Sequence, residues 1–334
     1  MIYINQNESP IAALTPSEIA DIVAASDFKV YPEGQYEAFL KAYADFYHLN
    51  TNQVLAANGS DEWIQKCMLA LPEGPVLALN PDFVMYTEFA RQTDRPIEYV
   101  ECEADFSFSL EKILTRIEEV RPAFFIISVP HNPTGIQYSA HFLKAISDKL
   151  KSIGSYFVLD EAYIEFGQPN KIPLESHLII MKTLSKAFAL AGLRIGIVIS
   201  TPETIQLLNR LAHPYPMSTL SLRIAEALFK NHTRVEHLLA EQRFLCRKLQ
   251  DIFTQYVDDK MTVIPSKANF VFTYGTHARD LGEYVLARGF QPRFYEEALL
   301  SEAVRYSIAT EQELNQLSEI VKEWSDQFEL QQTT

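Results

Sequence analysis

Short apolar runs of strand length alternate with amphipathic stretches through the first two-thirds of the chain. Apolar runs predict strands near residues 76–79, 97–100, 123–129, 155–160, 178–182 and 194–199. Between them, apolar residues recur at helical spacing near residues 82–92, 109–119 and 139–151. Such alternation favours a mostly parallel sheet with helices packed on both faces.

Two further helices are expected before this alternation begins. Aromatic residues at helical spacing from Tyr36 to Tyr47 predict an amphipathic helix over residues 34–48. The sequence NGSD at 58–61 predicts a turn, followed by a helix that runs through Leu71.

The pattern changes in the last third of the chain. A helix-rich stretch runs from Pro202 to about Tyr256. Strands are expected near 261–264, 269–274 and 304–308, with helices near 279–289 and 311–327. This switch from α/β to α+β, between residues 210 and 240, predicts the start of a second domain.

Composition and charge exclude several classes of protein. The 334 residues are 47% hydrophobic and 22% charged, which is typical of a globular protein and not of a disordered one. The net charge is −14 and no run of Lys or Arg stands out, so nucleic acid is not an expected partner. The apolar runs are far shorter than the ~20 residues that span a bilayer, so no membrane association is expected.

Cysteine usage and the first residues predict a cytoplasmic protein. Cys67, Cys102 and Cys246 are scattered, without the CxxC spacing of a zinc site or a redox pair, so no metal is expected. The first basic residue is Lys29, so the N-terminus lacks the positive region of a secretory signal. We interpret the cysteines as reduced thiols.

Several chemically distinctive residues lie where predicted strands end, which is where open α/β sheets bind ligands. Lys186, in Thr-Leu-Ser-Lys at 183–186, follows the strand at 178–182. A lysine in a pocket forms Schiff bases with carbonyls, although most lysines are exposed to solvent. Arg194 lies between Gly192 and Gly196 among apolar residues, and an anion is its expected partner.

Other strand ends carry polar groups that have two interpretations each. Asp160 ends a strand and could pair with a protonated ring nitrogen, or cap the next helix. Asn132, in Asn-Pro-Thr-Gly at 132–135, could donate to a ligand oxygen or belong only to a turn.

The segment at 59–61 and one aromatic side chain complete the set. Gly59, Ser60 and Asp61 open a helix whose N–H groups could hold a phosphate, or they could simply cap it. Tyr86 could stack on a flat ligand, although an aromatic residue on an amphipathic helix is more often part of the core.

The order and spacing of these segments are more specific than any one of them. Asp160 follows Asn132 by 28 residues, Lys186 follows Asp160 by 26, and Arg194 follows Lys186 by eight. This series resembles the class I/II aminotransferases, which are fold-type I pyridoxal-phosphate enzymes. NGSDE at 58–62, DEAYIEF at 160–166 and TLSKAFALAGLRIG at 183–196 are most similar to the histidinol-phosphate aminotransferase branch.

The resemblance implies an α/β fold of the fold-type I pyridoxal-phosphate transferases and assigns a role to each motif. Lys186 would form the Schiff base with pyridoxal 5′-phosphate and later move the proton of the substrate Cα. Asp160 would keep the ring nitrogen protonated. Asn132 and Tyr163 would hydrogen-bond the phenolate oxygen, and Tyr86 would stack on the ring. The implied phosphate ligands are Gly59, Ser60, Asp61, Thr183, Ser185 and Arg194.

The same resemblance implies a homodimer and three parts of the chain. Tyr31, which precedes Pro32, would reach the cofactor phosphate in the partner's active site. An N-terminal arm over the active site, residues 1–25, would precede a large cofactor domain, 26–225, and a small substrate domain, 226–334.

Substrate choice is expected to depend on the small domain. Arg293 and Arg305 match two arginines of the branch, and two guanidinium forks suit a dianion better than a carboxylate. Asn7, in the N-terminal arm, is a further candidate contact. Glutamate would donate the amino group to imidazole-acetol phosphate and become 2-oxoglutarate. An aromatic or other oxo acid is the alternative acceptor, because Ala309 replaces the glycine usual in the branch.

Three other functions are alternatives to transamination. A decarboxylase of a phosphorylated amino acid would use the same lysine in the same fold. A non-catalytic effector-binding module of a regulator is disfavoured because no basic helix-turn-helix precedes Asn7. A nicotinamide-dependent dehydrogenase is disfavoured because the chain contains no G-x-G-x-x-G sequence.

Overall fold

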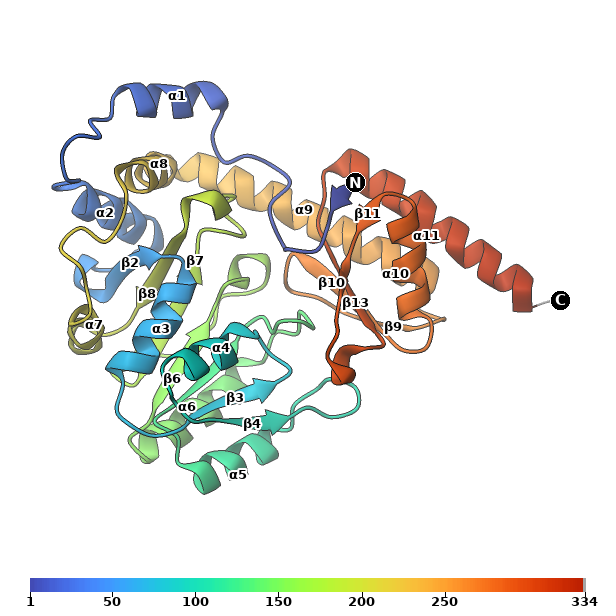
Figure 1. Ribbon diagram of the computed structural model, residues 1–334, viewed down its shortest axis with the longest axis horizontal. Coiled ribbons are helices and arrows are strands. Elements are labelled where there is room, and N and C mark those ends of the chain that lie inside the picture. Colours follow the sequence, from blue (N-terminus) through green and yellow to red (C-terminus); the bar gives the residue numbers. More distant parts are fainter. Residues whose placement is uncertain (333–334) are drawn as a thin grey trace.

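A central seven-stranded sheet dominates the computed structural model, which describes residues 1–332 (Figure 1). Its strands lie in the order β2-β8-β7-β6-β5-β3-β4. Their bounds are β2 (Val54–Asn58), β3 (Val76–Asn80), β4 (Ile97–Glu101), β5 (Phe124–Ser128), β6 (Tyr156–Asp160), β7 (Leu178–Thr183) and β8 (Ile195–Ile199).

The sheet is mostly parallel, as the sequence predicts. Strands β4, β3, β5, β6 and β7 pair in parallel, whereas β8 is antiparallel to both β7 and β2. Strand β2 was not predicted, because its alanines have a weak preference for strands and its pairing with the distant β8 decides its conformation.

Helices cover both faces of this sheet. Consecutive residues of a strand point to opposite faces, so Phe124 and Ile126 pack on one side and Phe125 and Ile127 on the other. Helices α3 (Ser60–Ala70), α4 (Met85–Gln92) and α7 (Pro202–Asn209) cover the first face, and α5 (Leu110–Val120) and α6 (Ala140–Ser152) cover the second. The predicted two-faced arrangement is therefore confirmed.

A third group of helices packs beside the β2–β8 edge. It consists of α1 (Pro16–Ala24), α2 (Gln35–Tyr47) and α8 (Thr219–Phe229). The predicted aromatic face of α2 is present, because Phe39 and Tyr43 are fully buried and both pack against Phe229 of α8. Helix α1, by contrast, buries no residue.

A smaller four-stranded sheet forms the centre of the second half of the molecule. Its order is β12-β13-β10-β9, and all neighbours are antiparallel. The bounds are β9 (Thr262–Ile264), β10 (Phe270–Tyr274), β12 (Arg293–Phe294) and β13 (Ala303–Ser307). Helices α9 (His232–Val257), α10 (Ala278–Ala287) and α11 (Glu311–Gln332) pack with this sheet.

Two elements connect the halves of the molecule. Helix α9 runs from one half to the other (Figure 1), with Val235 and Leu239 in the core of the large half and Leu245 and Leu249 in that of the small half. Strand β1 (Ile2–Tyr3) pairs in parallel with β11 (Phe290–Gln291), so the N-terminus is attached to the small half. Four short 3-10 helices complete the elements of the described residues: η1 (Thr51–Gln53), η2 (Ile164–Phe166), η3 (Ala191–Leu193) and η4 (Ala298–Leu300).

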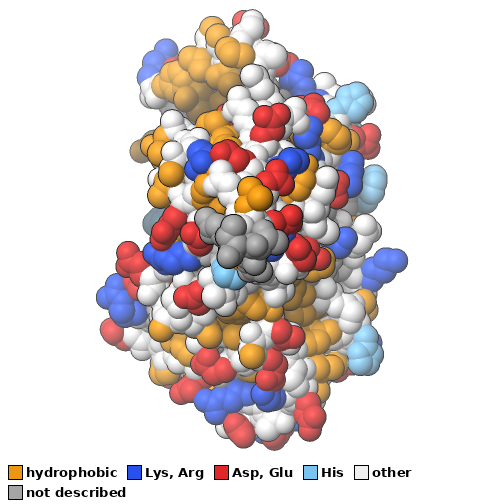
Figure 2. Space-filling view, turned by 90° about the vertical axis from the view of Figure 1, so that its right-hand side faces the viewer, with side chains coloured by type: hydrophobic (Ala, Val, Ile, Leu, Met, Phe, Trp, Pro, Cys, Tyr) orange, Lys and Arg blue, Asp and Glu red, His pale blue; other side chains and the backbone are white. Residues whose placement is uncertain are grey.

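Charged side chains of both signs are distributed over the surface. Figure 2 shows one face of the molecule, on which acidic and basic side chains are interspersed. Within residues 1–332, no helix is long and apolar enough to cross a membrane.

The close approach of β8 to the Gly59–Ser60 peptide is predicted to require glycine at position 196. A Cβ atom there would lie 2.2 Å from the Gly59 carbonyl carbon and 2.3 Å from the Ser60 nitrogen. Gly196→Ala should therefore lower the free energy of unfolding by about 1–3 kcal/mol, the usual cost of overpacking. Urea denaturation measures this change.

Gly192→Ala is the matched control, because a Cβ atom at Gly192 would meet no atom within 4 Å. Its midpoint should stay near that of the wild type. Equal midpoints for the two variants would contradict the assigned contact.

Candidate functional site

The strand-end pocket is a cavity of about 520 Å³ between the C-terminal ends of the parallel strands and the small sheet. This volume is in the usual range for small-molecule sites. Most of the predicted site residues line it: Asn7, Ser60, Asp61, Asn132, Asp160, Tyr163, Thr183, Ser185, Lys186, Arg194, Arg293 and Arg305. The chain therefore brings together side chains that are far apart in sequence.

Lys186 supplies an amine with altered basicity. Its Nζ donates a hydrogen bond to the Gln6 carbonyl oxygen at 2.8 Å. Burial lowers the pKa of Lys186 to about 8, and the positive charges of Arg305 and Arg194 act in the same direction. The neutral, nucleophilic fraction of this amine at neutral pH is therefore much larger than that of an ordinary lysine, although the protonated form still predominates.

Asp160 supplies a buried carboxylate at the end of β6. Its Oδ2 accepts a hydrogen bond from the Tyr86 hydroxyl at 2.9 Å, and its Oδ1 accepts one from the Ala162 N–H. Burial raises the pKa of Asp160 to about 6. A cationic group in the pocket would offset this cost of burying a negative charge.

Tyr86 lies elsewhere than predicted. It is only 1% exposed, does not line the pocket and uses its hydroxyl on Asp160. A neighbouring aromatic ring that does line the pocket belongs to Phe83, which packs edge-on against Tyr86. The prediction of a stacking role for Tyr86 is corrected accordingly, because the α4 helix turns this side chain into the core.

Polar groups at the start of α3, at the end of β7 and just before β8 form an anion cradle, which comprises Ser60, Asp61, Thr183, Ser185 and Arg194. The Ser185 Oγ accepts hydrogen bonds from Thr183 Oγ1 at 2.9 Å and from Arg194 Nη1 at 3.3 Å. Arg194 Nη2 is 3.1 Å from Asp61 Oδ2, so Asp61 offers an anion only its backbone N–H. The helix N-terminus adds further N–H groups and the positive end of its dipole.

Gly59 shapes this cradle from behind without lining the pocket. Its φ of +84° is in the left-handed region, and a Cβ atom there would lie 2.7 Å from Arg194 Nη2. The turn into α3 therefore favours glycine, and any larger residue would also displace the end of the Arg194 side chain.

Arg305 and Arg293 form the opposite wall of the pocket. They are directly paired across the antiparallel strands β12 and β13, so both side chains leave the same face of the sheet. Arg305 Nη1 donates to Asn132 Oδ1 at 2.7 Å, whereas its buried Nε has no partner in the described structure. Within residues 1–332 neither arginine forms an ion pair with a carboxylate, so this wall is suited to an anion.

Asn7 and Tyr163 close the pocket between the two halves. The Asn7 Nδ2 donates to the Tyr163 hydroxyl at 2.9 Å, and Asn7 Oδ1 accepts from the Ser307 hydroxyl. Asn7 is 2% exposed with a φ of +57°. Its side chain is therefore engaged mainly in holding the N-terminal segment, with one amide hydrogen left for a ligand.

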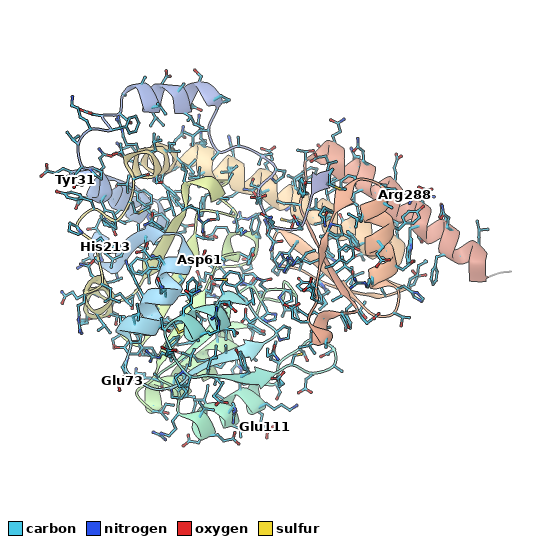
Figure 3. The ribbon with its side chains drawn as sticks, viewed as in Figure 1. Tyr31, Asp61, Glu73, Glu111, His213 and Arg288 are labelled. Carbon is cyan, nitrogen blue, oxygen red and sulfur yellow. The ribbon has the colours of Figure 1, made fainter. Side chains whose placement is uncertain are left out.

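Tyr31 lies outside this pocket. Its side chain is 73% exposed and its ring stacks on Tyr215 at a centroid distance of 4.6 Å. Figure 3 places Tyr31 at the outer edge of the molecule, away from Asp61 near its centre. Tyr31 therefore does not reach the pocket of its own chain.

Sequence reasoning did not single out Asp82, Phe83 or Tyr295, which also line the pocket. Asp82 and Phe83 follow β3, so the rule that ligands bind at strand ends could have found them. Asp82 is buried and accepts hydrogen bonds from the Ser128 hydroxyl and N–H, and burial raises the pKa of Asp82 to about 7. Tyr295 follows a two-residue strand, which no periodicity could identify.

The functional groups that line the pocket fit pyridoxal 5′-phosphate. This compound has an aldehyde, a basic ring nitrogen and a phosphate. The partly neutral amine of Lys186, the buried carboxylate of Asp160 and the anion cradle supply a matching group for each. Phe83 offers an aromatic surface for the ring.

Comparison with known proteins shows one consistent family. The family model "Aminotransferase class I and II" matches residues 3–321. A histidinol-phosphate aminotransferase of Caldanaerobacter subterraneus is 30% identical over 335 aligned positions, which cover 95% of this chain and 92% of the relative.

Solved structures share the fold. The histidinol-phosphate aminotransferase of Sinorhizobium meliloti, in complex with pyridoxal-5′-phosphate, has a TM-score of 0.85 and 23% identity, covering 98% of this chain and 91% of that chain. The L-threonine-O-3-phosphate decarboxylase of Porphyromonas gingivalis has a TM-score of 0.78 and 16% identity, covering 98% of this chain and all of that chain. At these identities the likeness shows the architecture alone.

The lowered pKa of Lys186 predicts unusual reactivity in the cofactor-free protein. Labelling by a small aldehyde, trapped with borohydride, should reach half its maximum near pH 8, because only the neutral amine reacts. An ordinary lysine would titrate near pH ~10.4. Peptide mass spectrometry across a pH series measures the profile at Lys186.

Lys182 is an internal control, because Glu161 and Glu165 raise the pKa of this buried lysine. It should remain unlabelled where Lys186 reacts. Labelling of Lys186 that begins only above pH 10 would refute the assigned environment.

Proposed function

The chain belongs to the class I and II aminotransferases, and we propose that it moves an amino group between glutamate and imidazole-acetol phosphate, as a histidinol-phosphate:2-oxoglutarate aminotransferase does. It is an enzyme, and its cofactor is pyridoxal 5′-phosphate. The proposal concerns the identity of the substrate and the roles of individual residues.

One observation carries the choice of a phosphorylated acceptor: the Arg293–Arg305 pair. Like charges placed directly opposite each other on paired strands repel, and no carboxylate of the described residues neutralises these two. A dianion between them would relieve the repulsion and engage two planar donor forks. A phenylpyruvate side chain offers no charge for the second fork. The curated relative that matches over nearly the whole chain has the same activity.

Pyridoxal 5′-phosphate supplies an aldehyde that condenses with amines and a protonated ring that accepts electron density. The anion cradle would hold its phosphate and Phe83 would lie against its ring. Asp160 would keep a proton on the ring nitrogen, because an ionised carboxylate in a buried site favours a cation beside it. Tyr163 and Asn132 would hydrogen-bond the phenolate oxygen.

Lys186 would act as the base and acid of the reaction. Its Nζ, with a pKa of about 8, can take a proton from the substrate Cα and return it at the cofactor C4′. Arg305 would orient the α-carboxylate or phosphate of the substrate, since its Nε is buried and without a partner. The Gln6 carbonyl oxygen would hold the amine in the pocket whenever Lys186 is not bonded to the cofactor.

The proposal includes a homodimer with shared active sites. Tyr31 is exposed at 73% and stacked on another exposed tyrosine, Tyr215, outside its own pocket. Phe28 and Val30 of the same segment are also more than half exposed. An apolar surface of this kind suits a subunit interface, across which Tyr31 would reach the partner's phosphate site.

The organisation of the chain is part of the same proposal. The N-terminal arm would comprise residues 1–25, the large cofactor domain 26–225 and the small substrate domain 226–334. The separate hydrophobic clusters of the two sheets support this division, although α9 contributes to both. We further infer a cytoplasmic location, consistent with three free cysteines.

Substrate choice can be tested with a panel of acceptors. With glutamate as donor, kcat/KM should be higher for imidazole-acetol phosphate than for phenylpyruvate. Arg293→Met should lower kcat/KM for imidazole-acetol phosphate by about 10- to 100-fold, the usual effect of losing a hydrogen bond to a charged group. The value of kcat/KM for phenylpyruvate should change little. Steady-state kinetics and release of 2-oxoglutarate provide the measurements.

Arg288→Met is the control, because Arg288 pairs with Glu323 on the outer side of the small half (Figure 3). It should leave both substrates unaffected. Equal turnover of the two acceptors would contradict the phosphate role of Arg293. Release of carbon dioxide without 2-oxoglutarate would instead identify a decarboxylase.

Shared active sites predict complementation between two inactive variants. A dimer of one Lys186→Ala chain and one Tyr31→Ala chain contains one site with both residues intact. Random pairing should restore about a quarter of the wild-type activity, because half of the dimers are mixed and each has one intact site. Co-expression followed by activity per dimer measures the recovery.

Lys186→Ala combined with Asp160→Asn is the control. Both residues line the same pocket of one chain, so no mixed dimer has an intact site. Activity restored in neither mixture would contradict the assignment of Tyr31 to the partner's site.

A further inference from the structure

Tyr295 lies beside the arginine pair, in the loop that follows β12. Its ring packs edge-on against Phe272 of β10 and belongs to the same hydrophobic cluster as Leu300. The residue is 9% exposed and lines the strand-end pocket. Packing therefore fixes the ring and leaves its hydroxyl little freedom to move.

The hydroxyl of Tyr295 is buried and has no hydrogen-bond partner among the described residues. Buried hydroxyl groups in folded proteins are almost always paired, because an unpaired one has lost its water without compensation. At the wall of a pocket, the missing partner is most simply a group of the bound ligand.

The surroundings of this hydroxyl specify the charge of that group. The Arg293 guanidinium lies 5.6 Å from the centroid of the Tyr295 ring. Arg305 and Arg293 both act to lower the pKa of Tyr295, but burial outweighs them and keeps it raised, so the hydroxyl remains a donor. Glu297, which also lines the pocket, acts on Tyr295 in the opposite direction; it is exposed to solvent, as Arg293 is, and solvent screens the charges of both. An anion is thus the acceptor that this place favours.

The number of donors distinguishes two kinds of anion. A carboxylate has two oxygens, which a single guanidinium fork can engage. A phosphate monoester has three terminal oxygens and close to two negative charges, so two forks leave room for a further donor. Arg293, Arg305 and Tyr295 together supply such a set on the small-sheet side of the pocket, across from the anion cradle.

We propose that Tyr295 is a specificity-determining residue, whose hydroxyl donates a hydrogen bond to the phosphate group of a phosphate-monoester substrate held by Arg293 and Arg305. This inference rests on the proposed function and deepens it. It assigns to one neutral side chain part of the discrimination between phosphorylated and unphosphorylated acceptors.

The test compares Tyr295→Phe with wild-type holoenzyme. For imidazole-acetol phosphate, KM should rise by about 10- to 100-fold, as expected for losing one hydrogen bond to a charged group, with kcat changed far less. KM for glutamate and phenylpyruvate should stay within about twofold, since neither carries a phosphate.

Tyr138→Phe is the matched control, because Tyr138 also has a buried hydroxyl without a partner but does not line the pocket. It should leave all three KM values unchanged. A second readout is inhibition of phenylpyruvate transamination by glycerol 3-phosphate, an inert phosphate monoester, which should weaken in Tyr295→Phe and not in Tyr138→Phe.

The outcomes separate this inference from the proposed function. If KM rose equally for all substrates, or if the preference for the phosphate ester were unchanged, the role of Tyr295 would be overturned and the proposed function would stand. Wild-type enzyme that does not use imidazole-acetol phosphate, yet is inhibited by glycerol 3-phosphate through Tyr295, would reject the proposed substrate and support the phosphate contact.

Discussion

The strand-end pocket depends on the hydrogen bonds of one buried residue, Asn7. Its backbone N–H donates to the Ser307 hydroxyl, its carbonyl oxygen accepts from Asn269, and its side chain reaches Tyr163. These bonds join the N-terminal segment to the small sheet and to the end of β6 in the large sheet. Arg305, which donates to Asn132 and to the Asn5 carbonyl oxygen, adds a second connection. Together with α9 and with the packing of Phe106 on Phe272 and of Tyr163 on Phe270, these bonds hold the walls of the pocket together.

The electrostatics of the pocket follow from this closure. Because Lys186, Arg305 and Arg194 are brought close together around a partly buried space, each positive charge raises the cost of the next. The lysine responds by losing basicity, whereas arginine cannot and retains its charge. Asp160 and Asp82 have raised pKa values for the corresponding reason, which is burial without a neighbouring cation. A ligand with two anionic groups and a basic nitrogen would reduce both the repulsion between the cations and the cost of burying the carboxylates.

Much of the fold could be predicted from the sequence because its signals are local. A continuous apolar run such as Phe124 to Ile127 indicates a strand buried on both faces, whatever it pairs with. Strand β2 escaped prediction because its conformation depends on β8, over 130 residues away in sequence. In the site, Lys186, Asp160 and Asn132 could be anticipated from strand ends and motif spacing. The sequence did not reveal that Phe83, and not Tyr86, faces the pocket, because the direction of each ring is set by how the chain enters α4 and packs on the sheet.

The sequence by itself determined the layered α/β architecture, the cofactor motifs and the family resemblance, since each depends on residues that are near one another along the chain or at fixed intervals. Only the tertiary structure decided which side chains meet. The pairing of Arg293 with Arg305, the unpaired hydroxyl of Tyr295 and the contacts of Asn7 with residues 156, 262 and 300 positions away have no local signal. They arise because burial of two separate cores forces distant polar groups into one dry space, where each must find a partner or await a ligand.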